Sequence, residues 1–141
     1  MADTGYNWSA VAHATYNTGT DVDGIAVNDE ATLTTDEIDL DDKAGCEVSV
    51  GVVEDNTGAC DGDAYVYVLR SDLDPDSEGW QTIDDAVAGY AIDATQNAER
   101  IITFAVDPGQ VGGFKILVDN DSGQQLAVTI NYRTATIPAA S

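Results

Sequence analysis

Apolar and polar residues alternate along three stretches in the last third of the chain, between Arg100 and Thr136. A period of two places one set of side chains on a buried face and the other set outward, which predicts antiparallel strands with one face in solvent. Turn-forming residues separate the stretches, at 107–109, at 112–113 and at 120–123. The apolar positions are Ile102, Phe104 and Val106, then Phe114, Ile116 and Val118, then Leu126, Val128, Ile130 and Tyr132.

Shorter alternations, separated by turn residues, fill the rest of the chain. Residues 46–53 carry Cys or Val at every second position, and the alternating stretch 63–70 follows after a nine-residue polar loop, which predicts a hairpin. The segment 7–17 fits a strand and a helical stripe almost equally well, and the turn residues that follow favour the strand. Further short strands are predicted at 25–27, 31–34, 37–40 and 89–93.

These elements predict an all-β protein. Eight or nine strands at this spacing are typical of an antiparallel β-sandwich with a jelly-roll-like arrangement. The length of 141 residues is that of one domain, 1–141, which we expect to carry a candidate N-terminal arm at 1–20 and a flexible tail at 137–141.

One predicted strand is apolar on both faces. Tyr65 and Tyr67 alternate with Ala64, Val66 and Val68, and a strand of this kind is usually central, with cover on each side. The two tyrosines pack under a loop in one interpretation. In the other they form an exposed aromatic patch for a partner.

The charge of the chain is strongly one-sided. The formal net charge is −21, with 26 acidic against five basic residues, and 20 of the acids are Asp, which favours turns. This sign argues against binding to nucleic acid or to an anionic membrane surface. Two interpretations stay open, a saline (halophilic) habitat and a basic partner.

Neither a membrane span nor a secretory signal is predicted. The chain contains no stretch of about 20 apolar residues, as a membrane-spanning helix requires. Its first residues have neither a basic segment nor an apolar segment of the kind found in signal peptides.

The two cysteines, Cys46 and Cys60, are predicted to be free thiols. In the predicted hairpin Cys46 begins the first strand, about 25 Å from the turn, and Cys60 lies at the turn. A disulfide needs Cα atoms within about 7 Å. We therefore expect Cys46 to be a core residue and Cys60 an exposed thiol.

One acidic stretch has half of a calcium-loop pattern. Carboxylates stand at every second position at Asp72, Asp74, Asp76 and Glu78, but Ser77 replaces the expected glycine and no acid follows at the distal position. A divalent cation such as Ca²⁺ is a candidate ligand here. Chance spacing among the 20 aspartates is the alternative.

Nothing in the sequence predicts catalysis. The single histidine, His13, lies in the ambiguous segment 7–17 and is expected to be a packed or surface residue. The chain has no nucleophile elbow, no phosphate-binding loop and no Cys/His metal spacing. We therefore expect no enzymatic activity.

Three stretches together carry a resemblance. Glu37-Ile38-Asp39-Leu40 leads through Lys43-Ala44-Gly45 into a strand, AYVYVLRSD precedes an acidic loop with Trp80, and FKILVDNDSGQQLAVTINYRTAT lies near the end. This succession resembles the small β-sandwich structural proteins of tailed viruses of bacteria and archaea, over about residues 24–136. The resemblance implies a virion protein, either a capsid decoration (cement) protein or a tail component, and it carries no site residues.

A decoration role implies partners and a location. The main partner would be the major capsid protein, and the protein would lie on the outer capsid surface as a homo-oligomer, most simply a homotrimer at three-fold positions. Trp8 and Tyr16, in the N-terminal segment, are the natural contacts to the shell or to neighbouring copies.

The alternative is a carbohydrate-binding or tail-fibre module. Such modules present aromatic side chains on an exposed sandwich face. Tyr65, Tyr67, Trp80 and Tyr90 are the residues that would form this platform.

Overall fold

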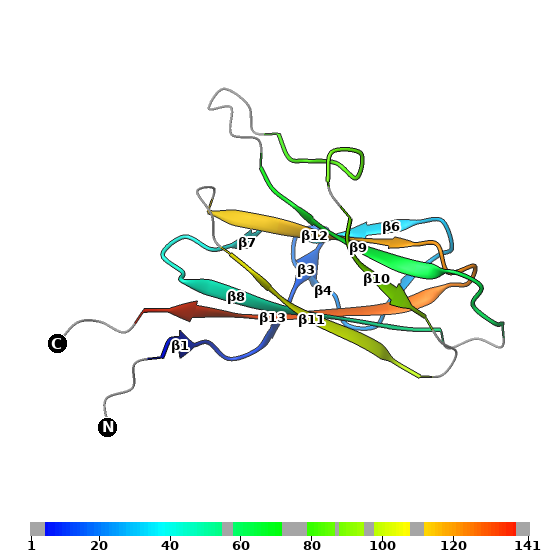
Figure 1. Ribbon diagram of the computed structural model, residues 1–141, viewed down its shortest axis with the longest axis horizontal. Helices are drawn as coiled ribbons and strands as arrows, with labels where there is room; N and C mark the ends of the chain where they lie inside the picture. Colours follow the sequence, from blue (N-terminus) through cyan, green and yellow to red (C-terminus); the bar gives the residue numbers. More distant parts are fainter. Residues whose placement is uncertain are drawn as a thin grey trace.

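The computed structural model describes residues 5–54, 58–71, 79–86, 88–94, 98–107 and 112–137. These residues form thirteen β-strands and no helix, and all strand pairs are antiparallel. Two sheets lie face to face, as Figure 1 shows, so the predicted all-β sandwich is confirmed. The strand number exceeds the prediction because the N-terminal segment is divided into two-residue strands.

Sheet A is built around the longest strand. Its strands are β1 (Asn7–Trp8), β13 (Leu126–Thr136), β8 (Gly45–Val53) and β11 (Arg100–Val106), in this order, and β2 (Ala12–His13) and β5 (Ile25–Val27) also pair with β13. One edge of β13 therefore pairs with β8, and the three short strands follow one another along its other edge.

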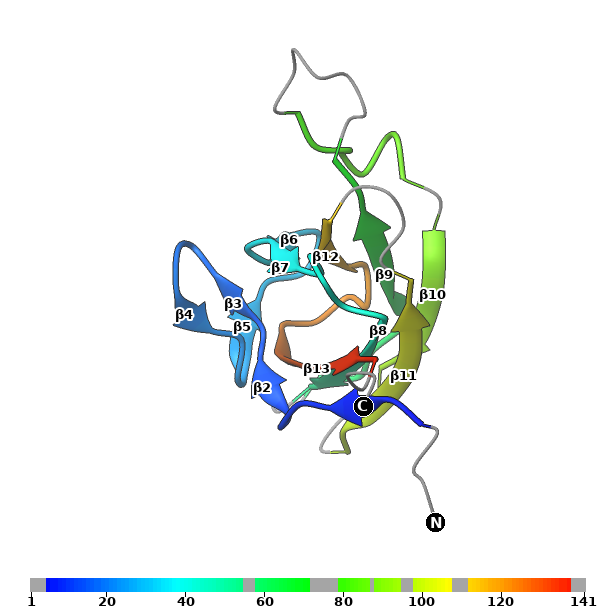
Figure 2. The same ribbon diagram turned by 90° about the vertical axis from the view of Figure 1, so that its left-hand side faces the viewer.

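Sheet B covers the inner face of sheet A. Its strands are β10 (Ala88–Asp93), β9 (Asp63–Leu69), β12 (Gly113–Asn120) and β6 (Thr32–Thr34), in this order, and β7 (Ile38–Asp39) also pairs with β12. A separate hairpin consists of β3 (Thr15–Tyr16) and β4 (Thr20–Asp21). The end view in Figure 2 shows β9 and β12 across from β8 and β13.

The predicted hairpin of residues 46–53 and 63–70 is wrong. Its two strands, β8 and β9, lie in different sheets, where β8 pairs with β11 and β13 and β9 pairs with β10 and β12. The chain also crosses between sheets from β11 to β12 and back to β13. Crossing gives the apolar face of each strand a partner in the opposite layer, which a solvated two-stranded hairpin cannot supply.

Other sequence predictions agree with the strands. The predicted strand at 25–27 is β5, and β9 is central in its sheet, as its two apolar faces indicated. The segment 7–17 contains β1, β2 and β3, so the strand prediction is confirmed and the helical stripe is not formed.

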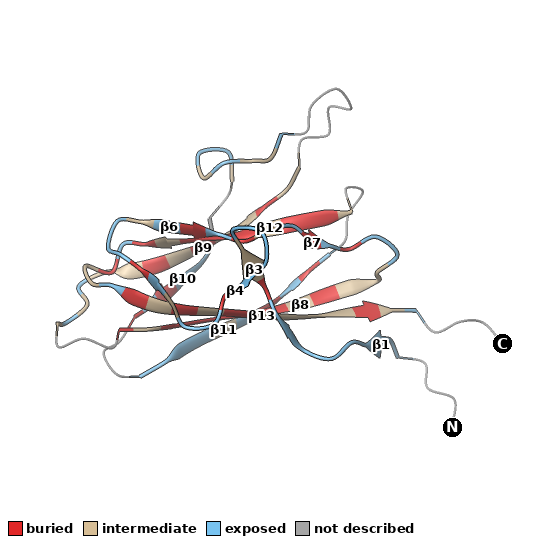
Figure 3. Cartoon of the chain, turned by 180° about the vertical axis from the view of Figure 1, so that it is seen from behind, coloured by how far each residue is buried: buried red, intermediate tan, exposed pale blue. Residues whose placement is uncertain are grey.

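The core fills the space between the sheets. In sheet A the register places Val52 opposite Val128, Val50 opposite Ile130, and Val48 opposite Phe104, so the inward side chains form continuous rows. Figure 3 shows buried residues along β8, β12 and β13. The side chains with no exposed surface include Val48, Val50, Val52, Val66, Phe114, Ile116, Val118, Leu126, Val128 and Ile130.

A buried amide joins the two sheets at one end. The Asn120 side chain has no exposed surface, and its Nδ2 donates to Val27 O (2.9 Å) and Gln124 O (2.7 Å). Its Oδ1 accepts from Ser122 N (3.0 Å) and Ser122 Oγ (2.7 Å). Because every polar atom of this side chain has a partner, the buried amide stabilises the turn after β12 and its contact with β5.

A carboxylate fixes the β3–β4 hairpin. Asp36 accepts hydrogen bonds from Thr15 Oγ1 (2.8 Å), Thr18 N (3.0 Å) and Gly19 N (3.0 Å). Burial raises the pKa of Asp36, but these hydrogen bonds and Lys115 outweigh it, so the pKa lies below its ordinary value. The turn needs this support because Asn17 and Thr18 have positive φ angles of 48° and 57°.

Both cysteines are free, as predicted, but Cys60 is half-buried rather than fully exposed. Burial, followed by the charge of Glu47, raises the pKa of Cys46 to about 11. Burial and neighbouring acids also raise the pKa of Cys60, and a hydrogen bond with Ser122 opposes this. Both thiols are therefore poor nucleophiles at neutral pH.

Asn120→Ala is expected to lower the free energy of unfolding by about 2–4 kcal/mol, because it removes the amide that donates to the carbonyls of Val27 and Gln124 and accepts from Ser122 N. Urea unfolding followed by tryptophan fluorescence measures the change. Asn131→Ala, on the outward face of sheet A, is the control and should change the stability by less than about 0.5 kcal/mol. An equal loss in both variants would contradict the role given to the amide.

Thiol labelling at pH 8 should modify at most one cysteine per folded chain, and slowly. At a pKa of about 11 only roughly one Cys46 in a thousand is thiolate, and its side chain is buried. Absorbance with an aromatic disulfide reagent measures the reaction, and the unfolded chain should yield two thiols. Cys60→Ser should abolish labelling of the folded protein, and rapid labelling of that variant would show that the core opens at Cys46.

Candidate partner-binding face

An exposed arm lies along the edge of sheet A. Residues 5–13 are all exposed, and β1 pairs with β13 through Trp8 opposite Ala135. Ser9 N donates to Thr134 O (2.8 Å), and Thr134 N donates to Ser9 Oγ (2.9 Å). The arm thereby covers one end of the β13 edge and holds its aromatic side chains in fixed positions.

Trp8 belongs to a stack of three side chains on the outward face of sheet A. The Arg133 guanidinium lies over the Trp8 ring, with Cζ 4.3 Å from the ring centroid. The same guanidinium donates from Nη2 (2.6 Å) and Nε (3.2 Å) to Glu47 Oε1. Tyr6 meets Trp8 edge to face, at 6.5 Å between centroids. Cation–π and charge-assisted contacts together hold the indole in one orientation.

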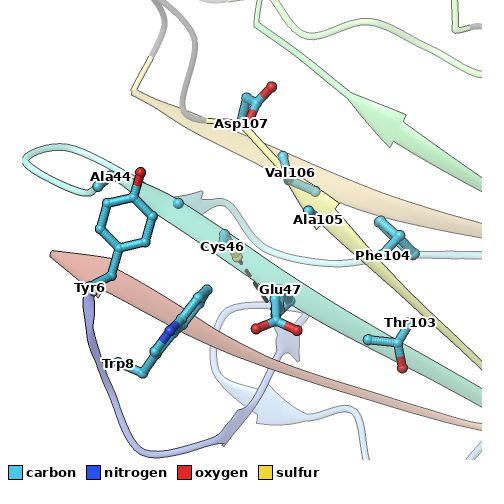
Figure 4. A pocket seen from close by; sticks show the side chains of 11 residues that line it. Tyr6, Trp8, Ala44, Cys46, Glu47, Thr103, Phe104, Ala105, Val106 and Asp107 are labelled. Carbon is cyan, nitrogen blue, oxygen red and sulfur yellow. Dashed lines mark hydrogen bonds between the residues drawn. The ribbon is translucent and has the colours of Figure 1, made fainter. Parts of the chain in front are cut away.

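A groove of about 440 Å³ opens beside this stack. Figure 4 shows Tyr6 and Trp8 on one side of it and Thr103, Ala105 and Asp107, from β11 and its end, on the other. A second hollow of about 170 Å³ adjoins it, since both are lined by Glu47 and Thr103. We call this surface the arm face: Tyr6, Trp8, Val11, Glu47, Thr103, Asp107, Asn131 and Arg133.

The arm face is suited to recognition. Tyr6, Trp8 and Val11 are exposed over 52%, 40% and 65% of their surface, and they lie beside a carboxylate, a hydroxyl and an amide. Tryptophan, tyrosine and arginine are the residues that most often dominate binding energy at interfaces. A partner placed on this face would meet both apolar surface and polar groups able to orient it.

The aromatic residues predicted to bind a partner lie in different settings. Tyr65 and Tyr67 are half-buried on the outward face of sheet B, and Tyr67 stands opposite the buried Leu117. Trp80 is half-buried, with Lys115 Nζ 4.6 Å from its ring centroid.

Tyr16 and Tyr90 lie elsewhere. Tyr16 is half-buried and packs against the core, and Tyr90 stacks on Phe104 with ring centroids 4.5 Å apart. Lys115, whose ammonium lies over Trp80, shares the outward face of sheet B with Tyr65 and Tyr67, so Trp80 lies toward the same face as the two tyrosines. Tyr90 lies apart from them on Phe104, and Trp8 lies on the arm face. The binding roles of these residues stay predictions.

The sequence analysis also considered a candidate cation site and the single histidine. Asp72, Asp74, Asp76 and Glu78 lie outside the described residues, and within the described ranges no group of three or more potential ligands is placed to hold a metal ion. His13 is a surface residue whose Nε2 lies 3.8 Å from Asp23 Oδ2.

Sequence reasoning missed Tyr6, Glu47 and Arg133. Glu47 and Arg133 each occupy an outward position of an alternating strand, which is visible in the sequence. Their meeting depends on the register of β8 with β13, where Glu47 lies opposite Arg133 across 86 positions of sequence. No local signal predicts such a pairing.

Comparison with known proteins finds solved structures with a similar fold. No family model and no curated protein matches the sequence. Among solved structures, the CBM22-1 and GH10 modules of Clostridium thermocellum xylanase 10B match with a TM-score of 0.53 and 15% identity, over 98% of this chain and 28% of that one. The CBM22-1 xylan-binding domain of Paenibacillus barcinonensis Xyn10C matches with a TM-score of 0.51 and 14% identity, over 98% and 100%.

The vertex protein of PRD1 is also similar, with a TM-score of 0.46 and 15% identity, over 91% of this chain and 96% of that one. The chain spans a little over a quarter of the length of the xylanase structure that it matches. At these identities the likeness concerns the fold alone, and it agrees with the β-sandwich described above.

Acidic side chains gather at the opposite end of the molecule from the arm. Asp29, Glu30, Asp61 and Asp121 line an open hollow of about 480 Å³ near the turn after β12. Burial, the charge of Asp121 and a hydrogen bond between the two carboxyl groups raise the pKa of Asp119 above its ordinary value. The carboxylates in this part of the molecule repel one another, and this repulsion lowers the stability of the folded state.

Asp119→Asn should stabilise the protein at neutral pH by about 0.5 kcal/mol after solvent screening, or about 2 °C in Tm. The raised pKa means that the folded state loses stability as pH rises through the ordinary value toward the folded value. The advantage of the variant should therefore vanish below the ordinary value of 3.8. Thermal unfolding from pH 3 to 8 measures it, with Asp21→Asn removing one charge elsewhere as control. If Tm depends on pH in the same way in both variants, the gain in stability comes from the lower net charge alone and not from the surroundings of Asp119.

Proposed function

We propose that this chain is a non-enzymatic structural protein of a virion, a capsid decoration protein that attaches to the outer surface of a major capsid lattice. The observation that carries the proposal is the arm face, where exposed aromatics stand fixed beside an open groove on an otherwise acidic molecule. The sequence resemblance to virion β-sandwich proteins supports the same role.

The physical properties of the molecule suit attachment to a lattice. Trp8 is held by Arg133, so little conformational entropy is lost when a partner covers it. The net charge of −21 repels nucleic acid and keeps free copies of the chain apart, so copies come together only where the lattice holds them. The same acidic, lysine-poor surface suits a saline environment.

The proposal includes a location and partners. The major capsid protein is the partner of the arm face, the protein resides on the capsid surface, and copies meet as a homotrimer at three-fold positions of the lattice. The β1 strand and the C-terminal end of β13 lie at the same end of the sandwich, so the arm and this end of β13 would approach the lattice together (Figure 1).

A second candidate function is carbohydrate binding, and the composition of the groove favours it. Tyr6 and Trp8 supply aromatic surface, while Glu47, Thr103 and Asp107 supply hydrogen-bonding groups, in a groove of the size that takes small ligands. A solved domain of similar fold is described as xylan-binding. In this second proposal the arm face, rather than Tyr65, Tyr67, Trp80 and Tyr90, is the surface that binds the carbohydrate.

Trp8→Ala should abolish co-sedimentation with capsids, or weaken it at least tenfold, because an aromatic anchor at an interface typically contributes 2 kcal/mol or more. Purified protein is mixed with undecorated capsids of the virus that encodes it, and the pelleted fraction is measured against protein concentration.

Tyr90→Ala is the matched control, since Tyr90 is also 40% exposed but lies on β10. It should pellet like the parent protein. Retardation in xylan or other polysaccharide gels that is lost in Trp8→Ala, together with no capsid binding by the parent, would select the carbohydrate function. Equal capsid binding by Trp8→Ala and the parent would overturn docking through the arm face.

A further inference from the structure

The groove of the arm face carries charge of one sign. Among the described residues that line it, the charged side chains are two carboxylates, Glu47 on β8 and Asp107 after β11. Arg133 lines the adjoining hollow instead. The exposed rings of Tyr6 and Trp8 line the same groove, as Figure 4 shows. Aromatic faces and carboxylates both attract cations, so the groove is suited to a positively charged group.

Both carboxylates have oxygen atoms that a ligand can reach. Arg133 donates twice to Glu47 Oε1, and no described residue donates to Oε2 of the Glu47 side chain, which is 34% exposed. Asp107 is exposed, and its carboxylate has no ion pair with any residue of the described ranges. The Arg70 guanidinium fixes the position of Asp107 by donating from Nη2 to its main-chain oxygen.

The molecule itself contains an example of the expected contact. The Arg133 guanidinium lies over the Trp8 ring and is bonded to the Glu47 carboxylate. The groove offers the same combination of ring and carboxylate, without a described lysine or arginine along it. Three of the five basic residues of the chain lie over aromatic rings in this way, Arg70 over Phe114, Lys115 over Trp80 and Arg133 over Trp8.

We propose that the groove binds a basic side chain of the partner, arginine in preference to lysine, because a planar guanidinium both stacks on rings and pairs with carboxylates. The groove is the docking surface of the proposed function, on which this inference rests, and the segment of the capsid protein that enters it is therefore basic. The guanidinium packs against the Tyr6 ring and pairs with Asp107, and Glu47 supplies a second carboxylate in the same groove.

Charge favours this occupant over others. The net charge of −21 attracts a basic segment from a distance, whereas an acidic or phosphorylated ligand is repelled by the molecule and by both carboxylates. A neutral sugar gains the contact with the rings but no ion pair. A charged ligand and a neutral ligand of the same size therefore distinguish the two kinds of occupant.

A short peptide tests the groove without a capsid. The ligand is the tripeptide Gly-Arg-Gly, acetylated and amidated, and the Trp8 indole N–H signal in NMR, identified by its loss in Trp8→Ala, reports binding. The dissociation constant should be about fivefold higher for the peptide with citrulline, which has the same shape without the charge. Equal affinity for both peptides, or no shift of the Trp8 signal with either, overturns the assignment. A larger shift with a neutral xylan oligosaccharide overturns it in favour of carbohydrate binding.

Asp107→Asn tests the carboxylate. It should raise the dissociation constant of the arginine peptide about threefold and leave that of the citrulline peptide unchanged, because one ion pair at an exposed site is lost. Asp21→Asn is the matched control, since Asp21 is also exposed but lies on β4, and it should bind the arginine peptide like the parent protein. An equal change in both variants, or no change in either, overturns the pairing with Asp107.

The peptide and capsid measurements separate this site from the proposed function. Peptide binding by a protein that does not sediment with capsids supports the site for a basic side chain and removes the capsid protein as its partner. Trp8-dependent capsid binding by a protein that does not distinguish the arginine peptide from the citrulline peptide overturns the site and leaves the proposed function standing.

Discussion

The apolar interior between the two sheets is the constraint on which the rest of this protein depends. Every long strand has a row of inward side chains with little or no exposed surface, from Cys46 to Val52 on β8 and from Leu126 to Ile130 on β13. Burial of this area is the main favourable term in folding, and it has to offset both chain entropy and the repulsion of 26 acids. The other described acids therefore lie in turns and on outward faces, where water and salt screen them, whereas Glu54, after β8, is fully buried.

Two of the polar side chains that enter the interior, Asn120 and Thr35, are matched to partners. Asn120 fills all its hydrogen bonds at the end where the chain turns from β12 to β13, and Thr35 Oγ1 accepts from Ile116 N. Such contacts add little net energy when made but cost several times more when lost. They select this arrangement of loops over others that would bury the same apolar strands.

The arm face follows from the same architecture. Because β13 is longer than its neighbours, its second edge is free to receive β1, and this places Trp8 over Arg133 and beside Glu47. A rigid sheet holds the groove floor, and a short edge segment supplies the aromatic wall. Recognition on such a scaffold needs no moving part.

The sequence by itself determined the fold class and the positions of the main strands. Those features depend on local patterns, a period of two and turn residues at strand ends. The free thiols were predicted from the hairpin that does not form, so only the tertiary structure establishes them. The tertiary structure alone decided which strands pair, so the hairpin of 46–53 with 63–70 was wrong although both strands exist. It also decided the arm face, because Glu47 and Arg133 meet only through a long-range register. The alternation of apolar and polar residues indicates on which face of a sheet a side chain lies, but not which residue lies opposite it on the next strand. That pairing depends on contacts between residues far apart in the chain.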